Sequence, residues 1–226
     1  TAERRFVVRA VDRAGRPGEP SAEVAAAPLE APVGPVFEAT FDGTKARTGQ
    51  EGRLGGKAKV ESGALDVREG GWIAYPGEEM LQIAGPITVE LWANVDRIEG
   101  IPVLISFGHW EAPGYWLQLI GGAIRSYLPV QRILDAGALP TGGWHHIAAA
   151  YDGATSRLYV DGKEAGSAAV GQVSIEPWPG ELRIGTYSDI DPQFQTLGRI
   201  DDVRIFQRAL GADEVRRSFE SGRTER

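Results

Sequence analysis

Short runs of alternating apolar and polar residues fill the chain from residue 36 onward, and glycine, proline or aspartate separates most of them. Alternation with a period of two is typical of β-strands, because successive side chains of a strand point to opposite faces. About twelve such strands with turn residues between them predict an all-β, two-sheet antiparallel sandwich rather than βαβ units. We expect strands at Val36–Phe41, Lys59–Val60, Ala64–Val67, Trp72–Ala74, Ile87–Val95, Val103–Phe107, Tyr115–Ile120, Ala123–Tyr127, Trp144–Tyr151, Arg157–Val160, Leu182–Ile184 and Asp201–Phe206.

The clearest hairpin lies within residues 144–162. Its second strand, Arg157–Val160, alternates so that Leu158 and Tyr159 point to opposite faces. The dipeptide Asp161-Gly162 follows directly, and it suits a two-residue turn because both central residues of that turn need positive φ. The pattern predicts an antiparallel meander with one face on the core and the other in solvent.

One helical segment is expected near the C-terminus, from Ala209 to Ser221. Asp213 and Glu214 lie in its first turn, where negative charge favours the helix dipole, and two arginines follow. Gly222 is expected to end the helix.

The first 35 residues differ from the rest in pattern. Residues 1–28 alternate on either side of a polar turn, which predicts two strands, although a disordered arm is the simpler alternative. Three prolines lie within residues 28–35, so we assign residues 29–35 to a stiff, extended linker and residues 36–226 to the main domain. Because one hairpin cannot build its own core, we expect residues 1–28 to be the end of a larger upstream domain.

Composition narrows the class of partner. The net charge is −7 and the basic residues are scattered, which argues against nucleic acid and anionic membranes as partners. No apolar run approaches the roughly 20 residues needed to span a bilayer, so membrane insertion is not expected. The chain contains no cysteine, which removes disulfides, zinc–thiolate sites and thiol nucleophiles together.

Catalytic patterns are missing from the sequence. Glycosidases built on a sandwich need two carboxylates facing one cleft, and no strand here carries acidic residues at that spacing. A serine nucleophile motif and a phosphate-binding glycine loop are also absent. His145 and His146 are adjacent in a strand and point apart, and His109 is the third histidine, so zinc is not expected. The sequence therefore predicts a protein that is not an enzyme.

Three stretches resemble a known family. The pattern WHHIA-x-x-YDG-x(4)-LYVDG, the strand PITVELWANVD and the closing segment GRIDDVRIFQRALGADEV are similar to bacterial laminin G-like (concanavalin A-like) jelly-roll domains. The resemblance covers roughly residues 36–221 and implies a jelly-roll sandwich in an extracellular, cell-surface or periplasmic protein. The stretch RFVVRAVDRAGRPGEPSAEVAAAP resembles the last two strands of a fibronectin type III domain.

Asp201 is the strongest candidate for a metal ligand. It stands at the end of a core-facing row in the last strand, where a carboxylate is costly unless it is paired or binds a cation. The resemblance implies a structural calcium ion held by Asp201 together with main-chain carbonyls near Thr40 and Gly63, and Asp42 could add a ligand. The alternative is that Asp201 caps a loop or pairs with an arginine such as Arg199.

Large aromatic residues in polar loops are the candidates for ligand contact. Trp110, Trp178, Tyr187 and Phe194 lie in loops, where each could contact a ligand or fold back over the edge of the sandwich. The tryptophans that alternate within strands, Trp92, Trp116 and Trp144, are assigned to the core.

The function that fits these observations best is non-catalytic recognition of a polysaccharide or other glycan. The chain would be an accessory module of a secreted, multidomain bacterial protein, most simply a carbohydrate-active enzyme, and would contact that protein's upstream domains. The alternative is a structural or adhesive module that contacts protein or its own parent chain and binds no glycan. Exposed loop aromatics with polar groups beside them would favour glycan binding, whereas buried or scattered ones would favour the alternative.

Overall fold

The computed structural model describes residues 4–6, 9–11, 17–20, 24–26, 33–108, 113–128, 133–173, 175, 177–187 and 191–223. The chain divides into two compact units, Thr1–Ala31 and Pro32–Arg226. In the first unit, β1 (Arg4–Phe6) pairs with β4 (Val24–Ala26), and β2 (Arg9–Val11) pairs with β3 (Pro17–Pro20), both antiparallel. The kinship of this unit with fibronectin type III domains stays a prediction.

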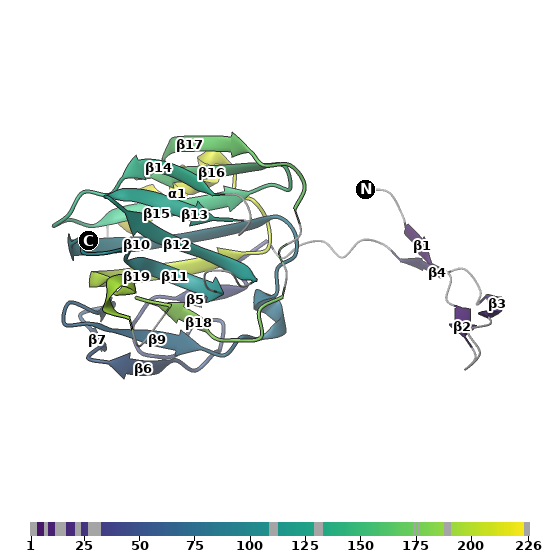
Figure 1. Cartoon of the computed structure of the whole chain (residues 1–226), viewed down its shortest axis with the longest axis horizontal. Coiled ribbons are helices and arrows are strands. Elements are labelled where there is room, and N and C mark those ends of the chain that lie inside the picture. The colour runs from purple at the N-terminus through teal and green to yellow at the C-terminus, as the bar shows by residue number, and fades with distance from the viewer. Residues whose placement is uncertain are drawn as a thin grey trace. The chain divides into compact units, whose positions relative to one another are not determined.

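The second unit is an antiparallel sandwich of two sheets, which confirms the predicted fold class (Figure 1). The eight-stranded sheet has the order β17 (Lys163–Ala169), β16 (Thr155–Val160), β15 (His145–Tyr151), β10 (Ile87–Arg97), β19 (Leu197–Phe206), β8 (Ala64–Asp66) and β7 (Lys59–Glu61), and β5 (Phe37–Ala39) also pairs with β19. The seven-stranded sheet has the order β14 (Leu134–Ala138), β13 (Ala123–Tyr127), β12 (Gly114–Ile120), β11 (Val103–Gly108), β18 (Leu182–Ile184), β9 (Gly71–Tyr75) and β6 (Arg53–Gly56). Two short 3-10 helices, η1 (Glu79–Leu81) and η2 (Pro192–Phe194), lie in the connections.

Every strand predicted for this unit is present, β13 and β18 with the predicted ends and the others with shifted ends, but three strands of the described chain were not predicted. They are β6, β14 and β17, and each lies at the edge of its sheet. Their sequences, RLGG, LDAGA and KEAGSAA, are rich in glycine, alanine and charged residues, which have low strand propensity. They are strands because a neighbouring strand offers its hydrogen-bonding groups, which a local pattern cannot reveal.

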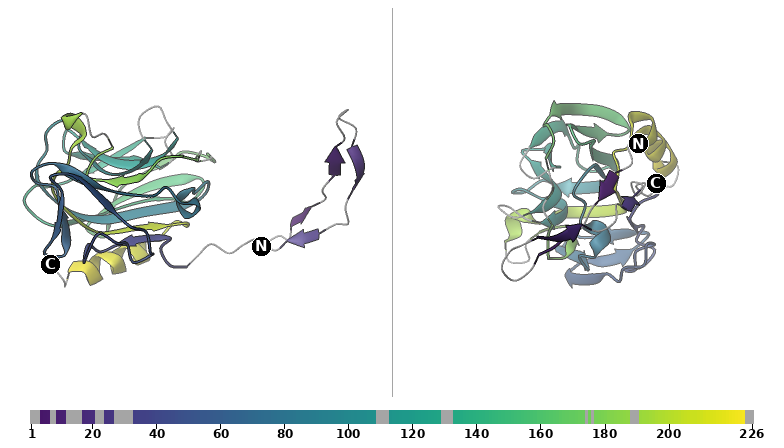
Figure 2. Two further views of the ribbon diagram at one scale, coloured as in Figure 1. Left: turned by 90° about the horizontal axis from the view of Figure 1, so that it is seen from below. Right: turned by 90° about the vertical axis from the view of Figure 1, so that its right-hand side faces the viewer.

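The C-terminal helix α1 (Ala212–Arg223) lies against the outer side of the eight-stranded sheet, as the left view of Figure 2 shows. The prediction that Gly222 ends the helix was wrong, since the helix runs through it. A Cβ at Gly222 would lie 2.5 Å from Nε1 of Trp92, so this glycine permits close packing of the helix on the indole ring. None of the helices in the described part of the chain is long and apolar enough to cross a membrane.

The predicted two-residue turn is confirmed at Asp161-Gly162, where φ is +49° and +73°. The Asp161 carboxylate accepts a hydrogen bond from the backbone N–H of His146 at 3.0 Å and lies 2.8 Å from Nδ1 of His145. Leu158 faces the core as expected, but Tyr159 is not in solvent. A second apolar cluster covers it on the helix side of the sheet, formed by Ala148, Ala150, Phe206, Leu210 and Val215.

The main core lies between the two sheets and is almost entirely aliphatic and aromatic. Trp92 and Trp116 are only 2 % and 1 % exposed, yet neither belongs to this core. Trp92 stacks on Phe219 of α1 with ring centroids 5.7 Å apart. Trp144 is half-buried, and the Cζ atom of Arg199 lies over its ring, 5.6 Å from the ring centroid. The assignment of Trp92 and Trp116 to the buried interior is therefore confirmed, although both lie outside the main cluster, whereas the assignment of the half-buried Trp144 was wrong.

Candidate functional site

The outer face of the seven-stranded sheet carries a continuous line of polar and aromatic side chains. Ile73, Ile105 and Leu117 point into the core, so their neighbours along each strand point outward. Cross-strand pairing joins the outward residues into one row, which we call the outer-face row: Arg53, Ala74, Arg183, Ser106, Trp116 and Tyr127. The row crosses the sheet from β6 to β13 and forms the spine of the candidate site.

At one end of the row, two aromatic rings and one amide form a rigid group. The rings of Trp116 and Tyr127 stack with centroids 4.1 Å apart. Gln118 connects their polar atoms, because its Oε1 accepts from Nε1 of Trp116 and its Nε2 donates to the Tyr127 hydroxyl, both at 3.2 Å. All three side chains are buried although they face away from the core. They form a floor with fixed geometry.

At the other end, Trp72 lies against two arginines. The Cζ atoms of Arg53 and Arg183 are 4.6 and 4.7 Å from its ring centroid, within the range of cation–π attraction. Glu181 binds Nη2 of Arg53 with both carboxylate oxygens at 3.0 Å and lies 3.6 Å from Nη2 of Arg183. A Cβ at Gly55 would lie 2.2 Å from Cζ2 of Trp72, so glycine lets the indole ring lie flat on β6.

Two of the predicted ligand-contacting residues meet each other. Tyr187 and Phe194 stack with ring centroids 4.4 Å apart, and both are half-buried. Burial, followed by the charges of Asp191 and Tyr127, raises the pKa of Tyr187. The Asp191 carboxylate also accepts from the backbone N–H of Gln193 and caps η2.

The remaining predicted aromatics are placed differently. Trp178 is half-buried and packs against the main core, while its backbone exchanges two hydrogen bonds with the Gln82 side chain at 2.8 and 2.6 Å. This is the folded-back arrangement considered above for loop aromatics. Trp110 lies outside the described residues, as does His109.

Arg125 lies opposite Gln118 on β13, and Asp135 lies opposite Arg125 on the edge strand β14. Nε and Nη2 of Arg125 donate to the two oxygens of Asp135 at 2.5 and 2.6 Å. This bidentate pair raises the pKa of Arg125 and lowers the pKa of Asp135. The Arg125 guanidinium is therefore held in one orientation by its two hydrogen bonds to Asp135.

Asp201 lies where two strands meet end to end on β19. β5 pairs with β19 as far as Ala39 opposite Val203, and β8 pairs as far as Leu65 opposite Ile200. Asp201 and Asp202 occupy the gap and are only 6 % and 7 % exposed. Continuing the two ladders brings the chain after Ala39 and before Ala64 to this gap, which includes Thr40 and Gly63.

The contacts at this junction show where the predicted calcium ligands lie. Oδ1 of Asp201 accepts from the N–H of Asp202 at 2.7 Å, and Asp202 lies 3.5 Å from Nη2 of Arg204. Asp42 is turned to solvent, where it accepts from the Thr40 hydroxyl at 3.0 Å and pairs with Arg47 at 3.4 Å. Among the described residues no group of three or more acidic, histidine or cysteine side chains could hold a metal ion, so carbonyl ligands would have to complete the set.

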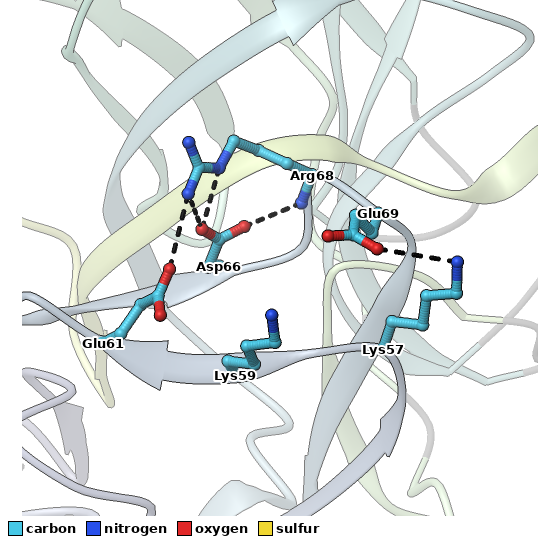
Figure 3. A pocket seen from close by; sticks show the side chains of 6 residues that line it. All are labelled: Lys57, Lys59, Glu61, Asp66, Arg68 and Glu69. Carbon is cyan, nitrogen blue, oxygen red and sulfur yellow. Dashed lines mark hydrogen bonds and ion pairs between the residues drawn. The ribbon is translucent and has the colours of Figure 1, made fainter.

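A hollow of about 300 Å³ lies beside β7 and β8 and is lined only by charged residues (Figure 3). Lys57 pairs with Glu69 at 3.6 Å, and Arg68 pairs with both Glu61 and Asp66. The hydrogen bond from Arg68 outweighs burial and holds the pKa of Asp66 at about 2. A general acid needs the opposite, a raised pKa, so this hollow does not suit acid–base catalysis.

The sequence analysis overlooked a buried charge network beneath α1. Glu90 is fully buried, and its carboxylate lies 3.3 Å from Nη1 of Arg204, 3.5 Å from Nε2 of His146 and 3.1 Å from the Ser218 hydroxyl of the helix. Burial would raise the pKa of Glu90, but His146 and Arg204 outweigh it and lower the pKa. Since α1 covers this carboxylate, the network stabilises the helix against the sheet and is closed to a substrate.

A sequence profile described as the concanavalin A-like lectin/glucanases superfamily, of the laminin G type, matches residues 68–216. The chain belongs to this superfamily. The resemblance seen in the three sequence stretches is thereby confirmed for the sandwich domain. No curated protein matches the chain.

Solved structures of this superfamily fold include binding domains from bacteria. Domain 4 of AbnA, an extracellular GH43 arabinanase of Geobacillus stearothermophilus determined with arabinotriose, is 21 % identical with a TM-score of 0.64, over 81 % of this chain and 97 % of that one. The ligand binding domain of botulinum neurotoxin serotype D, determined with N-acetylneuraminic acid, is 14 % identical with a TM-score of 0.66, over 83 % of this chain. The binding domain of Paraclostridial Mosquitocidal Protein 1 is 17 % identical with a TM-score of 0.64, also over 83 % of this chain.

This concanavalin A-like chain spans only about half of the two toxin structures, 51 % and 52 % of their lengths. It spans nearly all of the arabinanase domain. At these identities the likeness establishes the fold alone.

Proposed function

We propose that this chain is a non-catalytic carbohydrate-binding module, and that it binds glycans on the outer face of the seven-stranded sheet. The observation that carries the proposal is the outer-face row, with stacked aromatic rings at one end and arginines on an indole at the other. Sugar rings present C–H faces that pack on aromatic rings and hydroxyl groups that need fixed hydrogen-bonding partners. The half-buried Tyr187–Phe194 pair and the charged pairs would supply both kinds of contact, and the buried Trp116–Tyr127 pair would support this face from beneath.

The biological setting is part of the same proposal. The chain matches 97 % of a domain from an extracellular arabinanase, and that domain was determined in complex with arabinotriose. By analogy, the present chain would hold a secreted carbohydrate-active protein on its polymer. Trp110, which stands between β11 and β12 in the sequence, is proposed to contact the glycan together with Tyr187 and Phe194.

A structural or adhesive role is the second candidate. The observation that favours it is burial, because Trp178 packs against the core and Trp116 is only 1 % exposed. Such a module would contact protein and would bind no glycan.

Binding to a panel of soluble polysaccharides separates the two, with affinity gel electrophoresis as the measurement. We expect retardation by one class of polymer, and we expect Tyr187→Ala to weaken it about tenfold or more, since one ring lost from a site costs about 1–2 kcal/mol. Trp110→Ala should have a similar effect. Trp144→Ala is the matched control, because Trp144 is half-buried on the other sheet, beside Arg199, and its loss should leave retardation unchanged. Folded protein that no polymer retards would contradict glycan binding and favour the structural role.

We also propose a structural calcium ion at the junction of β5, β8 and β19. Asp201 would supply the carboxylate, and carbonyls near Thr40 and Gly63 would complete the shell, with Asp42 turning inward as a further ligand. The ion would supply only charge compensation and cross-linking of chain segments, since all these groups are hard oxygen donors. Its binding would stabilise the end-to-end docking of β5 and β8 on one strand.

Calcium should therefore raise the melting temperature of the wild-type chain, and a chelator should reverse the rise. Asp201→Ala should lower the melting temperature and abolish the response to calcium. Asp152→Ala is a suitable control, because Asp152 caps the turn after β15 and pairs with Arg157, and this variant should keep the response to calcium. A calcium response that survives in Asp201→Ala would overturn the assignment.

A further inference from the structure

The arginines of the outer face differ in how much of their hydrogen-bonding capacity is used. Arg125 gives Nε and Nη2 to Asp135, so its bidentate edge is filled. Arg53 binds Glu181 through Nη2 alone, and within the described part of the chain its Nε and both Nη1 hydrogens have no acceptor. Its side chain is 59 % exposed, so these donors face solvent.

Arg53 is nevertheless held in place. Its guanidinium lies on the Trp72 ring at 4.6 Å, and Glu181 fixes its far nitrogen with both carboxylate oxygens. A stacked guanidinium loses little side-chain entropy on binding a further group, because its orientation is already set.

An exposed, oriented arginine with unused donors on an indole ring suits one ligand chemistry above others. Neutral sugar hydroxyls accept hydrogen bonds from arginine, but a carboxylate adds an opposite charge to the same hydrogen bonds, which strengthens the pair. We infer that the glycan bound on this face is acidic, and that Nη1 of Arg53 donates hydrogen bonds to the carboxylate of a uronate residue. The inference rests on the proposed function and names the class of sugar for the same site.

The net charge of −7 on the whole chain works against an acidic ligand and sets the conditions of the test. Interactions between exposed charges are screened beyond about 8 Å at physiological ionic strength. Near 0.15 M salt the affinity for an acidic ligand therefore depends on the direct contact with Arg53 more than on the net charge of the chain. Binding should therefore be measured at that ionic strength.

The test compares two ligands that differ in one group. Oligogalacturonate and the corresponding galacto-oligosaccharide share ring geometry, and a carboxylate in the first replaces a hydroxymethyl group in the second. By titration calorimetry we expect oligogalacturonate to bind at least tenfold more tightly, and Arg53→Gln to remove that difference by weakening binding of the uronate far more than binding of the neutral ligand. Lys59→Gln is the matched control, since it removes the same charge from the edge strand β7 of the other sheet and should change neither affinity.

The outcomes separate the inference from the function on which it rests. If neutral oligosaccharides or polymers bind and the uronate binds no more tightly, glycan binding stands and the acidic preference is overturned. If Arg53→Gln weakens both ligands equally, Arg53 contacts sugar without reading the carboxylate, and the preference is again overturned. If a folded chain binds no glycan of either class, the proposed function fails and the inference fails with it.

Discussion

Replacing Arg204 by methionine is expected to lower the free energy of unfolding by about 3–5 kcal/mol, the usual cost of leaving a buried charge without its partner. Arg204 lies 3.3 Å from the fully buried Glu90 and 3.1 Å from Glu38. Methionine fills similar space but supplies no charge, so the Glu90 carboxylate would keep only His146 and Ser218 as neighbours. Urea denaturation at pH 7 measures the loss.

Arg216→Met is the matched control. Arg216 also lies beside two carboxylates, those of Asp213 and Glu220, but its side chain is 57 % exposed on α1. Exposed pairs of this kind contribute about 0–1 kcal/mol, so the control should be nearly as stable as the wild type. Equal stability of the two variants would show that the charge of Glu90 needs no buried partner.

The pH dependence of the Arg204 variant gives an independent check. In the wild type the pKa of Glu90 lies below its ordinary value of 4.5, so its charge adds stability above pH 4.5 that is lost as the pH falls through the lowered pKa. Without Arg204 that pKa should rise, because burial is then opposed by less positive charge. The deficit of Arg204→Met relative to the wild type should therefore shrink as the pH falls from the raised pKa of Glu90 in the variant to its lowered pKa in the wild type.

Gly222→Ala is expected to destabilise the fold by about 1–2 kcal/mol, although alanine is the better helix former by up to about 1 kcal/mol. The added Cβ would lie 2.5 Å from Nε1 and 2.9 Å from Cε2 of Trp92. The indole cannot move aside easily, because Phe219 stacks on it and His146 packs at 5.5 Å. The helix must then lift from the sheet, and a lower melting temperature should report this.

Gly85→Ala is the control for the backbone effect of the same substitution. No atom lies within 4 Å of a Cβ at Gly85, and its φ is outside the positive range. Replacing glycine at such a position should leave the melting temperature unchanged or raise it slightly, because the unfolded chain loses freedom. A Gly222 variant that behaves like this control would contradict close packing of the helix on Trp92.

Most of the sandwich could be predicted from local alternation, and the failures share one cause. β10 reads as a strand because every second residue is a large apolar one. β14 and β17 contain mostly small or charged residues and exist because β13 and β16 pair with them. Pairing with the open edge of a neighbouring strand leaves no mark on the sequence of the strand that pairs.

The candidate site was harder to predict, because alternation shows which residues share a face but not which face is the core. Trp116 alternates with Leu117, so either could point inward, and the tryptophan, although buried, lies on the outer side of the sheet while Leu117 belongs to the main core. The alternation of β10 predicts that Glu90 faces solvent. In the structure α1, which begins about 120 residues later in the chain, covers this side chain. The loop aromatics Tyr187 and Phe194 could be named from the sequence, but their mutual stacking could not.

The position of β19 has a consequence for how the chain folds during synthesis. This strand lies at residues 197–206, yet it pairs with β10 along one edge and with both β5 and β8 along the other. β5 therefore has no partner on this sheet, and the hairpin of β7 and β8 keeps one unpaired edge, until nearly the whole domain has left the ribosome. At about 5–20 residues per second they would wait on the order of ten seconds, with unpaired edges exposed. Chaperone binding to the nascent chain should accordingly end only after residue 206 emerges.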